Sequence, residues 1–176
     1  MIVERVDAAM GRRPFDVFLK NVRIVNVFDD TITEGSIGII GDRIAFVGTT
    51  AAPDRQANEV IDGRGRYVLP GFIDSHMHLE SSFLSPSAFA EAVLSCGTTT
   101  VAADPHEIAN AAGFEGVRAL AEASRGLPLR ILLEAPSTVP SAPGFEGSGY
   151  DVGPDAGGVA RVIDAIARAL ARGVDH

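Results

Sequence analysis

The sequence predicts an α/β protein in which a small β-sheet module is followed by βα units of a parallel sheet. The first observation is that short β-type runs alternate with turn residues before about residue 68. The second is that apolar strands and amphipathic helices alternate after that point, at intervals of roughly thirty residues, as they do in βα units. We therefore expect two domains, residues 1–68 and residues 69–176.

The amino-terminal module contains five short apolar runs of β type. These runs are residues 17–19, 22–27, 37–40, 44–47 and 60–61. Gly41 and Asp42 lie between the third and fourth runs and predict a hairpin turn, because both residue types tolerate a positive φ. We therefore expect these runs to form a small sheet.

Three strands are expected in the second domain, with a helix after each. The strands are residues 67–78, 98–104 and 129–134, and the second and third helices are residues 114–125 and 159–172. In the first helix, Ser85 is placed to cap the start, Pro86 suits the first turn and Gly97 can end the helix in the left-handed region. The Pro/Gly-rich stretch 136–158 predicts a long loop over a functional face.

Charge and hydropathy argue against two classes of partner. The formal net charge is −8 and no basic stripe is present, so binding to nucleic-acid phosphates is not expected. No run of about 18 apolar residues occurs, and the amino terminus carries acids and arginines where a signal peptide has its apolar run. We therefore expect neither a nucleic acid nor a membrane as partner.

Cys96 is the single cysteine and cannot form a disulfide within the chain, which fits a reducing compartment. We therefore expect a cytoplasmic protein. Because Val93, Leu94 and Gly97 surround Cys96 in the sequence, it is expected to be a small buried hydrophobic residue at a helix end rather than a nucleophile.

Polar side chains lie at the end of each expected strand of the second domain. They are Asp74, His76, His78 and Glu80 for the first strand, Asp104, His106 and Glu107 for the second, and Glu134 for the third. Ligands bind at the carboxyl ends of parallel strands, so these residues are expected at a functional crevice. Since side chains alternate along a strand, Asp74, His76 and His78 are expected on one face. Two neutral imidazoles can bind one catalytic divalent metal, while Asp74 orients a ring N–H from the second coordination shell.

Other interpretations stay open for these residues. An isolated His-x-His pair is often a surface or core pair, but the preceding segment 70–74 is apolar, so buried histidines would lack partners. His106 is either a loop histidine bonded to the backbone or a substrate or metal contact. Each glutamate, like Asp104, is either a loop-end carboxylate, a helix cap or a member of the site. His176 is expected in a disordered end.

The segment 67–78 resembles the first barrel strand of the metal-dependent amidohydrolase superfamily, with the sequence YVLPGFIDSHMH. Two further segments resemble its adenine deaminase branch more than any other. They are residues 78–113, HLESSFLSPSAFAEAVLSCGTTTVAADPHEIANAAG, and residues 135–149, APSTVPSAPGFEGSG. The resemblance covers about residues 14–149.

The resemblance implies a small β-sandwich over residues 1–68 and the first part of a (β/α)8, or TIM, barrel over residues 69–176. It also implies hydrolytic deamination of adenine, a small purine base, to hypoxanthine and ammonia. His76 and His78 carry over as metal ligands, and the implied metal is manganese or iron, with zinc as an alternative. The candidates for proton transfer or for contacts with the purine are Glu80, Asp104, His106, Glu107 and Glu134.

Several features depart from the family pattern. A TIM barrel needs about 250 residues, whereas this chain has room for three βα units, so the barrel cannot close. The family's further ligands, on the fourth and later strands, fall beyond this sequence. Lys20 lies in the sandwich and cannot be a bridging carbamylated lysine, and Thr138 stands where the family tends to have cysteine. The segment from Asp151 onward does not clearly resemble the family.

We therefore expect an amino-terminal fragment or truncated product that carries part of an active site. The site is completed by a missing carboxyl-terminal portion or in a homo-oligomer. Two alternatives stay open. The chain is an inactive remnant that associates through exposed strand edges, or the enzyme acts on another cyclic amide or amidine, such as a hydantoin or imidazolone. The strings HLESS and DPHE favour adenine.

Overall fold

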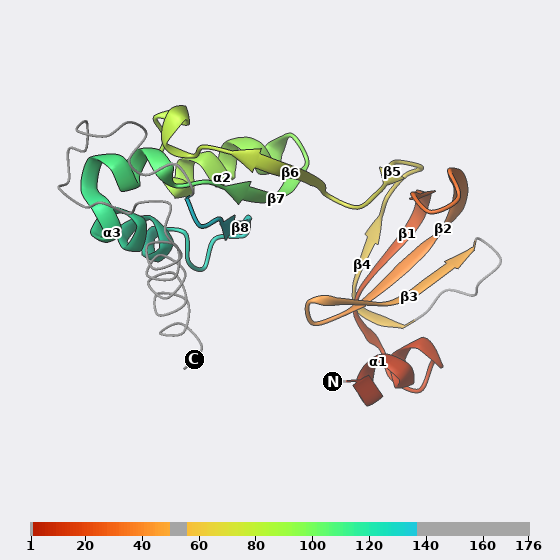
Figure 1. Cartoon of the computed structure of the whole chain (residues 1–176). Coiled ribbons are helices and arrows are strands. Elements are labelled where there is room, and N and C mark those ends of the chain that lie inside the picture. Colours follow the sequence, from red (N-terminus) through yellow and green to blue (C-terminus); the bar gives the residue numbers. More distant parts are fainter. Residues whose placement is uncertain (1, 50–55, 137–176) are drawn as a thin grey trace. The chain divides into compact units, whose positions relative to one another are not determined.

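The computed structural model describes residues 2–49 and 56–136, which form two compact units with a boundary between Pro70 and Gly71 (Figure 1). The first unit consists of a helix and a mixed sheet, and the second of a parallel sheet with helices in its connections. The expected mixed α/β fold class is therefore confirmed.

The first unit contains a five-stranded sheet and one helix. Its elements are α1 (Ile2–Ala9), β1 (Phe15–Asn26), β2 (Thr31–Ile40), β3 (Arg43–Thr49), β4 (Ala57–Asp62) and β5 (Tyr67–Val68). The strand order is β3-β2-β1-β4, and β5 also pairs with β1. β2 lies antiparallel to β1 and β3, whereas β4 and β5 lie parallel to β1. The expected turn between β2 and β3 is present, with Gly41 at φ +57°.

Aromatic rings form the core of the first unit. Phe15 and Phe18 are buried together with Ala8 of α1 and Ile40 of β2. The ring centroids of Phe15 and Phe18 are 5.7 Å apart, and that of Phe46 lies 5.9 Å from Phe15. The sequence interpretation did not include α1, whose buried Ala8 packs in this core.

The second unit is built from three parallel strands and their connections. Its elements are β6 (Phe72–Met77), the 3₁₀ helix η1 (Glu80–Ser82), α2 (Pro86–Ser95), β7 (Thr98–Ala103), α3 (His106–Ala123) and β8 (Arg130–Leu133). The strand order is β6-β7-β8, with α2 between β6 and β7 and α3 between β7 and β8 (Figure 1). Burial of Leu79, Phe89, Ala90, Val101 and Leu129 gives this unit its main core. Both crossovers expected in this part of the chain are therefore present.

The ends of α2 follow the sequence prediction. Ser85 is the N-cap and its hydroxyl accepts a hydrogen bond from the Ala88 N–H, while Pro86 occupies the first turn. Gly97 follows the helix with φ +91°, a conformation that a side chain with a Cβ rarely adopts.

Two expected strand boundaries are wrong. The runs 17–19 and 22–27 form one strand, β1, which continues through an irregularity at Asn21, where φ is +56° and the pairing with β2 shifts in register. The expected strand 67–78 is instead two strands that belong to different sheets. Pro70 separates them and lacks the N–H that a continuous strand would use.

Two further expectations in the second unit are wrong. The helix expected at residues 114–125 begins at His106, so His106 is not in a loop, and Gly113 with φ +61° and ψ −152° interrupts it. Cys96 is exposed rather than buried, because it lies at the C-cap of α2 beyond the buried face of the helix.

Part of the prediction falls outside the described residues. The third helix, residues 159–172, and all of the expected loop 136–158 except Pro136 belong to that part. Among the helices that the structure describes, none is both long enough and apolar enough to cross a membrane.

Candidate metal centre

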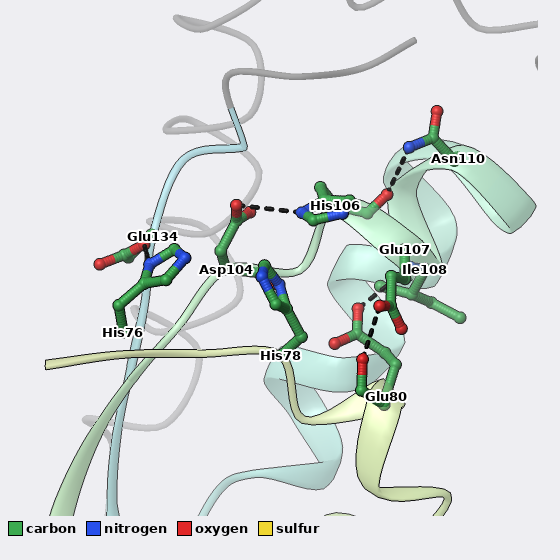
Figure 2. Close-up of polar contacts among 10 residues, drawn as sticks. His76, His78, Glu80, Asp104, His106, Glu107, Ile108, Asn110 and Glu134 are labelled. Atoms are coloured by element: carbon green, nitrogen blue, oxygen red, sulfur yellow. Dashed lines mark hydrogen bonds and ion pairs between the residues drawn. The ribbon is translucent and has the colours of Figure 1, made fainter. Parts of the chain in front are cut away.

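The carboxyl ends of β6, β7 and β8 bring the predicted site residues to one edge of the parallel sheet. Figure 2 shows His76 and His78 from the first strand end, Asp104 and His106 from the second, and Glu134 from the third. The backbone explains this convergence, because the Asp104 N–H donates to the Met77 carbonyl and the Glu134 N–H donates to the Ala103 carbonyl. Backbone hydrogen bonds thus connect the carboxyl end of each strand to the carboxyl end of the neighbouring strand.

His76 and His78 lie close together. Their ring centroids are 5.0 Å apart and the ring planes are nearly perpendicular, at 87°. The pairing of β6 with β7 shifts in register between Asp74 and Met77, so plain strand alternation does not hold through this segment. Asp74 itself accepts a hydrogen bond from the backbone N–H of His76 at 3.2 Å. This hydrogen bond joins Asp74 to the backbone of His76 and not to an imidazole ring.

Each imidazole of the pair has an acceptor at Nδ1. Nδ1 of His76 lies 3.1 Å from Oε2 of Glu134, and Nδ1 of His78 lies 3.0 Å from the carbonyl oxygen of Asp104. A carbonyl oxygen and an ionised carboxylate can only accept, so both Nδ1 atoms carry hydrogen when the rings are neutral. Both Nε2 lone pairs are then free to bind a metal. Such partners on the far nitrogen are usual for metal-binding histidines.

Asp104 links the histidine pair to a third imidazole. Its Oδ2 lies 3.1 Å from Nδ1 of His106, and the side chain of Asp104 is 13% exposed. The ring centroid of His106 lies 4.4 Å from that of His78. His106 therefore stands beside the pair with its Nδ1 held by a carboxylate, which leaves its Nε2 for another partner.

Glu80 and Glu107 make a second set of contacts, between η1 and the first turn of α3 (Figure 2). Oε1 of Glu80 accepts a hydrogen bond from the Ile108 N–H at 3.0 Å, and the Ser81 hydroxyl donates to Oε1 of Glu107 at 2.6 Å. Both carboxylates thus hold the loop after β6 against the start of α3. Neither carboxylate forms a hydrogen bond with His76 or His78.

A donor set for a metal ion emerges from these contacts. One ligand atom each from His76, His78 and Asp104 lies within 4.8 Å of the other two. Two neutral imidazoles and a carboxylate suit divalent manganese, iron and zinc, so the residues present fit a metal. The sequence predicted Asp104 as a catalytic or substrate-binding candidate and not as a member of this donor set. Its position directly after an apolar strand beside the His-x-His strand was the available signal.

Comparisons with known proteins identify the family of the chain. The model of the Amidohydrolase family matches residues 67–176. The adenine deaminase of Desulforamulus reducens is 44% identical over 152 residues, which are 86% of this chain and 26% of that protein. The adenine deaminase of Nitratidesulfovibrio vulgaris strain DP4 is 46% identical over 164 residues, 93% of this chain and 27% of that protein.

A solved structure gives the same family. The crystal structure of a D-aminoacylase, which is described as defining a novel subset of amidohydrolases, superposes with a TM-score of 0.57 at 26% identity. The match covers 91% of this chain and 37% of that one. This chain thus spans about a quarter of the length of the curated relatives that it matches. Since the family model covers more than half of the chain, the chain belongs to the amidohydrolase family.

Proposed function

We propose that this chain carries part of the active site of a metal-dependent adenine deaminase, which hydrolyses adenine to hypoxanthine and ammonia. The observation that carries the proposal is the imidazole pair, His76 and His78, whose Nδ1 atoms each face a hydrogen-bond acceptor. The identity of about 45% to proteins named adenine deaminase supports adenine as the substrate.

The metal that we propose is manganese or iron, with zinc as the alternative. His76 and His78 would hold it through Nε2. When bound, such a cation supplies Lewis-acid chemistry that makes water a usable nucleophile near neutral pH. The mixed nitrogen and oxygen donors at this sheet edge support a transition metal over calcium or magnesium, which prefer oxygen ligands alone.

The other polar residues are assigned to proton transfer and to positioning of the histidines. Addition of water at C6 of adenine and departure of the amine as ammonia require a proton at the leaving nitrogen. His106 is suited to hold that proton at Nε2, because Asp104 keeps its Nδ1–H in place. Glu134 orients His76, whereas Glu80 and Glu107 position the first turn of α3, which carries His106. Asp74 supports the backbone of His76.

We also propose that residues 1–68 are the amino-terminal β-sandwich and residues 69–176 the first part of the (β/α)8 barrel. The sheet of three parallel strands with two helical crossovers supports the second assignment. The edges of this sheet would pair with further strands of a longer protein or with a second copy. A cytoplasmic location is supported by the single cysteine.

Adenine turnover tests the proposed function. The 176-residue chain and a protein in which it continues past residue 176 are loaded with Mn²⁺ and assayed for hypoxanthine and ammonia. We expect deamination by the longer protein and its loss in His76→Ala. Hydantoin and imidazolone substrates are assayed in parallel. Absence of adenine turnover from both proteins would refute the assignment, and hydrolysis of the hydantoin alone would replace its substrate.

A further inference from the structure

We infer, on the basis of the proposed metal site, that Asp104 is its third protein ligand. The chain then binds one divalent cation by itself, through two imidazoles and one carboxylate. The sequence placed Asp104 among residues for proton transfer or purine binding, and its place at the end of β7 gives it this additional role.

The donor spacing supports a shared ion. Ligand atoms of His76, His78 and Asp104 all lie within 4.8 Å of one another. Donors bound to a single transition-metal ion at about 2.1 Å lie at most about 4 Å apart. The His76 side chain is 58% exposed, so binding of an ion would close this difference by rotation of its ring. The backbone bond from the Asp104 N–H to the Met77 carbonyl, 2.9 Å, holds the third donor beside the pair.

The two carboxylate oxygens of Asp104 differ in a way that points to a ligand. Oδ2 faces Nδ1 of His106, but Oδ1 is buried and has no hydrogen-bond partner among the described residues. A buried carboxylate oxygen without a partner is unfavourable, and a cation removes that cost. His106 would then be the hydrogen-bond partner of a metal ligand, Asp104, just as Glu134 is the hydrogen-bond partner of the ligand His76.

The charge of the three donors agrees with a catalytic rather than a sealed structural site. Two neutral imidazoles and one carboxylate give a donor charge of −1, which leaves a divalent ion positively charged. Catalytic zinc sites and two-histidine, one-carboxylate iron sites have three protein ligands and open positions for water or substrate. A fourth donor within the described residues is not required.

A competing role for Asp104 is to orient His106 without touching the metal. The two roles differ in their consequences. If Asp104 is a ligand, its loss weakens metal binding more than the loss of His106 does. If it acts only through His106, removal of either residue has the same small effect on metal affinity.

Metal affinity of the full 176-residue chain separates these roles. Mn²⁺ binding is measured by titration calorimetry and by the electron paramagnetic resonance signal of free Mn²⁺. The proteins are the wild type, Asp104→Asn, His106→Asn, the double variant His76→Ala/His78→Ala, and Glu91→Gln. Glu91 is an exposed carboxylate of α2 and gives the matched control. Far-ultraviolet circular dichroism in chelator checks folding, and Asp104→Ala replaces Asp104→Asn if the latter is unfolded.

We expect Asp104→Asn to weaken Mn²⁺ binding on the order of 100-fold or more, because loss of a mere outer partner already costs about 10- to 100-fold. His106→Asn is expected to weaken Mn²⁺ binding about tenfold. Glu91→Gln is expected to bind Mn²⁺ as the wild type does, and the double histidine variant is expected not to bind it. The ligand-field spectrum of the Co²⁺-loaded chain is expected to change in Asp104→Asn and to stay as in the wild type in His106→Asn.

Equal affinities of Asp104→Asn and the wild type, with binding lost in the double histidine variant, would overturn Asp104 as a ligand and leave the histidine site intact. A wild-type chain that binds no Mn²⁺ would overturn the claim that three donors suffice. Metal binding with the expected ranking but without adenine turnover in the longer protein would refute only the proposed substrate.

Discussion

At the scale of single residues, the two histidines depend on different kinds of acceptor. His78 is oriented by a backbone carbonyl, which mutation cannot remove, whereas His76 is oriented by the side chain of Glu134. The His76–Glu134 pair is also the more exposed, with side chains 58% and 38% exposed. His76 is therefore the proposed ligand whose orientation a substitution can change.

Glu134→Ala is expected to weaken Mn²⁺ binding about 10- to 100-fold, because Nδ1 of His76 loses the acceptor that fixes its tautomer. Glu134→Gln keeps an amide oxygen at the same place and is expected to lose less. Titration calorimetry on the two variants and the wild type measures the difference. Wild-type affinity in Glu134→Ala would show that this contact does not prepare the ligand.

His76 and His78 themselves could be predicted from the sequence, because their spacing and their place at an apolar strand end are local features. Their partners could not. The contacts with Glu134 and with the Asp104 carbonyl depend on how β6, β7 and β8 pair, and the register shift between Asp74 and Met77 is not visible in the residues. Asp74 was predicted to orient a ring because regular alternation along the strand was assumed, whereas in the structure Asp74 accepts a hydrogen bond from the backbone N–H of His76.

At the scale of elements, the break in α3 decides where the His106 segment points. Gly113 has φ +61° and ψ −152°, a region that is essentially restricted to glycine. The segment before it contains His106 and Ile108, whose N–H is bound by Glu80. The segment after it contributes Val117 and Ala121 to the buried face. The first half of α3 thus positions His106, whereas the second half packs in the core.

We expect Gly113→Ala to destabilise the protein by about 1–3 kcal/mol, because alanine disfavours this backbone conformation. In a regular helix the same substitution would stabilise by about 1 kcal/mol. Urea unfolding followed by circular dichroism gives the sign directly. A stabilised variant would mean that α3 is continuous through this position.

The turn after β4 offers a pH-dependent element. Asp62 accepts hydrogen bonds from the Arg64 N–H at 2.9 Å and from the Asn21 side chain at 3.1 Å. The Arg64 backbone bond, followed by the Asn21 bond, lowers the pKa of Asp62 below its ordinary value. A lowered folded-state pKa means that the contribution of Asp62 to stability is present above the unfolded pKa and is lost as the pH falls through the folded one.

Asp62→Ala is therefore expected to be less stable than the wild type at pH 7, and the difference is expected to shrink as the pH falls below about 4. Urea unfolding of both proteins at pH 7 and pH 3 measures it. A difference that stays the same at both pH values would show that the carboxylate charge contributes nothing.

The ends of α2 could be predicted because capping depends on adjacent residues, as Ser85, Pro86 and Gly97 show. The start of α3 could not be predicted, since Gly113 has the features of a helix boundary although the chain is helical on both sides of it. The division of residues 67–78 between two sheets was missed because pairing partners far along the chain decide it.

At the scale of the whole molecule, the proposed metal site belongs to the unit that begins at Gly71. All three donors lie at the ends of β6 and β7, whose positions depend on the fold of that unit. An unfolded chain does not hold these donors together, so metal binding at the proposed site would be coupled to folding.

Saturating Mn²⁺ is therefore expected to stabilise this unit, by about 2.7 kcal/mol at a free concentration 100 times the Kd. Calorimetric unfolding scans with and without chelator measure the shift in Tm. His78→Ala is expected to show no Mn²⁺-dependent shift. An equal shift in this variant would place the stabilising ion elsewhere in the chain.

Manganese bound between His76 and His78 is the feature on which the proposed function depends most directly. Anomalous diffraction from crystals of the chain grown with Mn²⁺ locates the ion without reference to activity. We expect an anomalous peak about 2.1 Å from Nε2 of both histidines and from a carboxylate oxygen of Asp104. Ordered His76 and His78 rings with no peak between them, or a peak bound only to other residues, would contradict the metal centre.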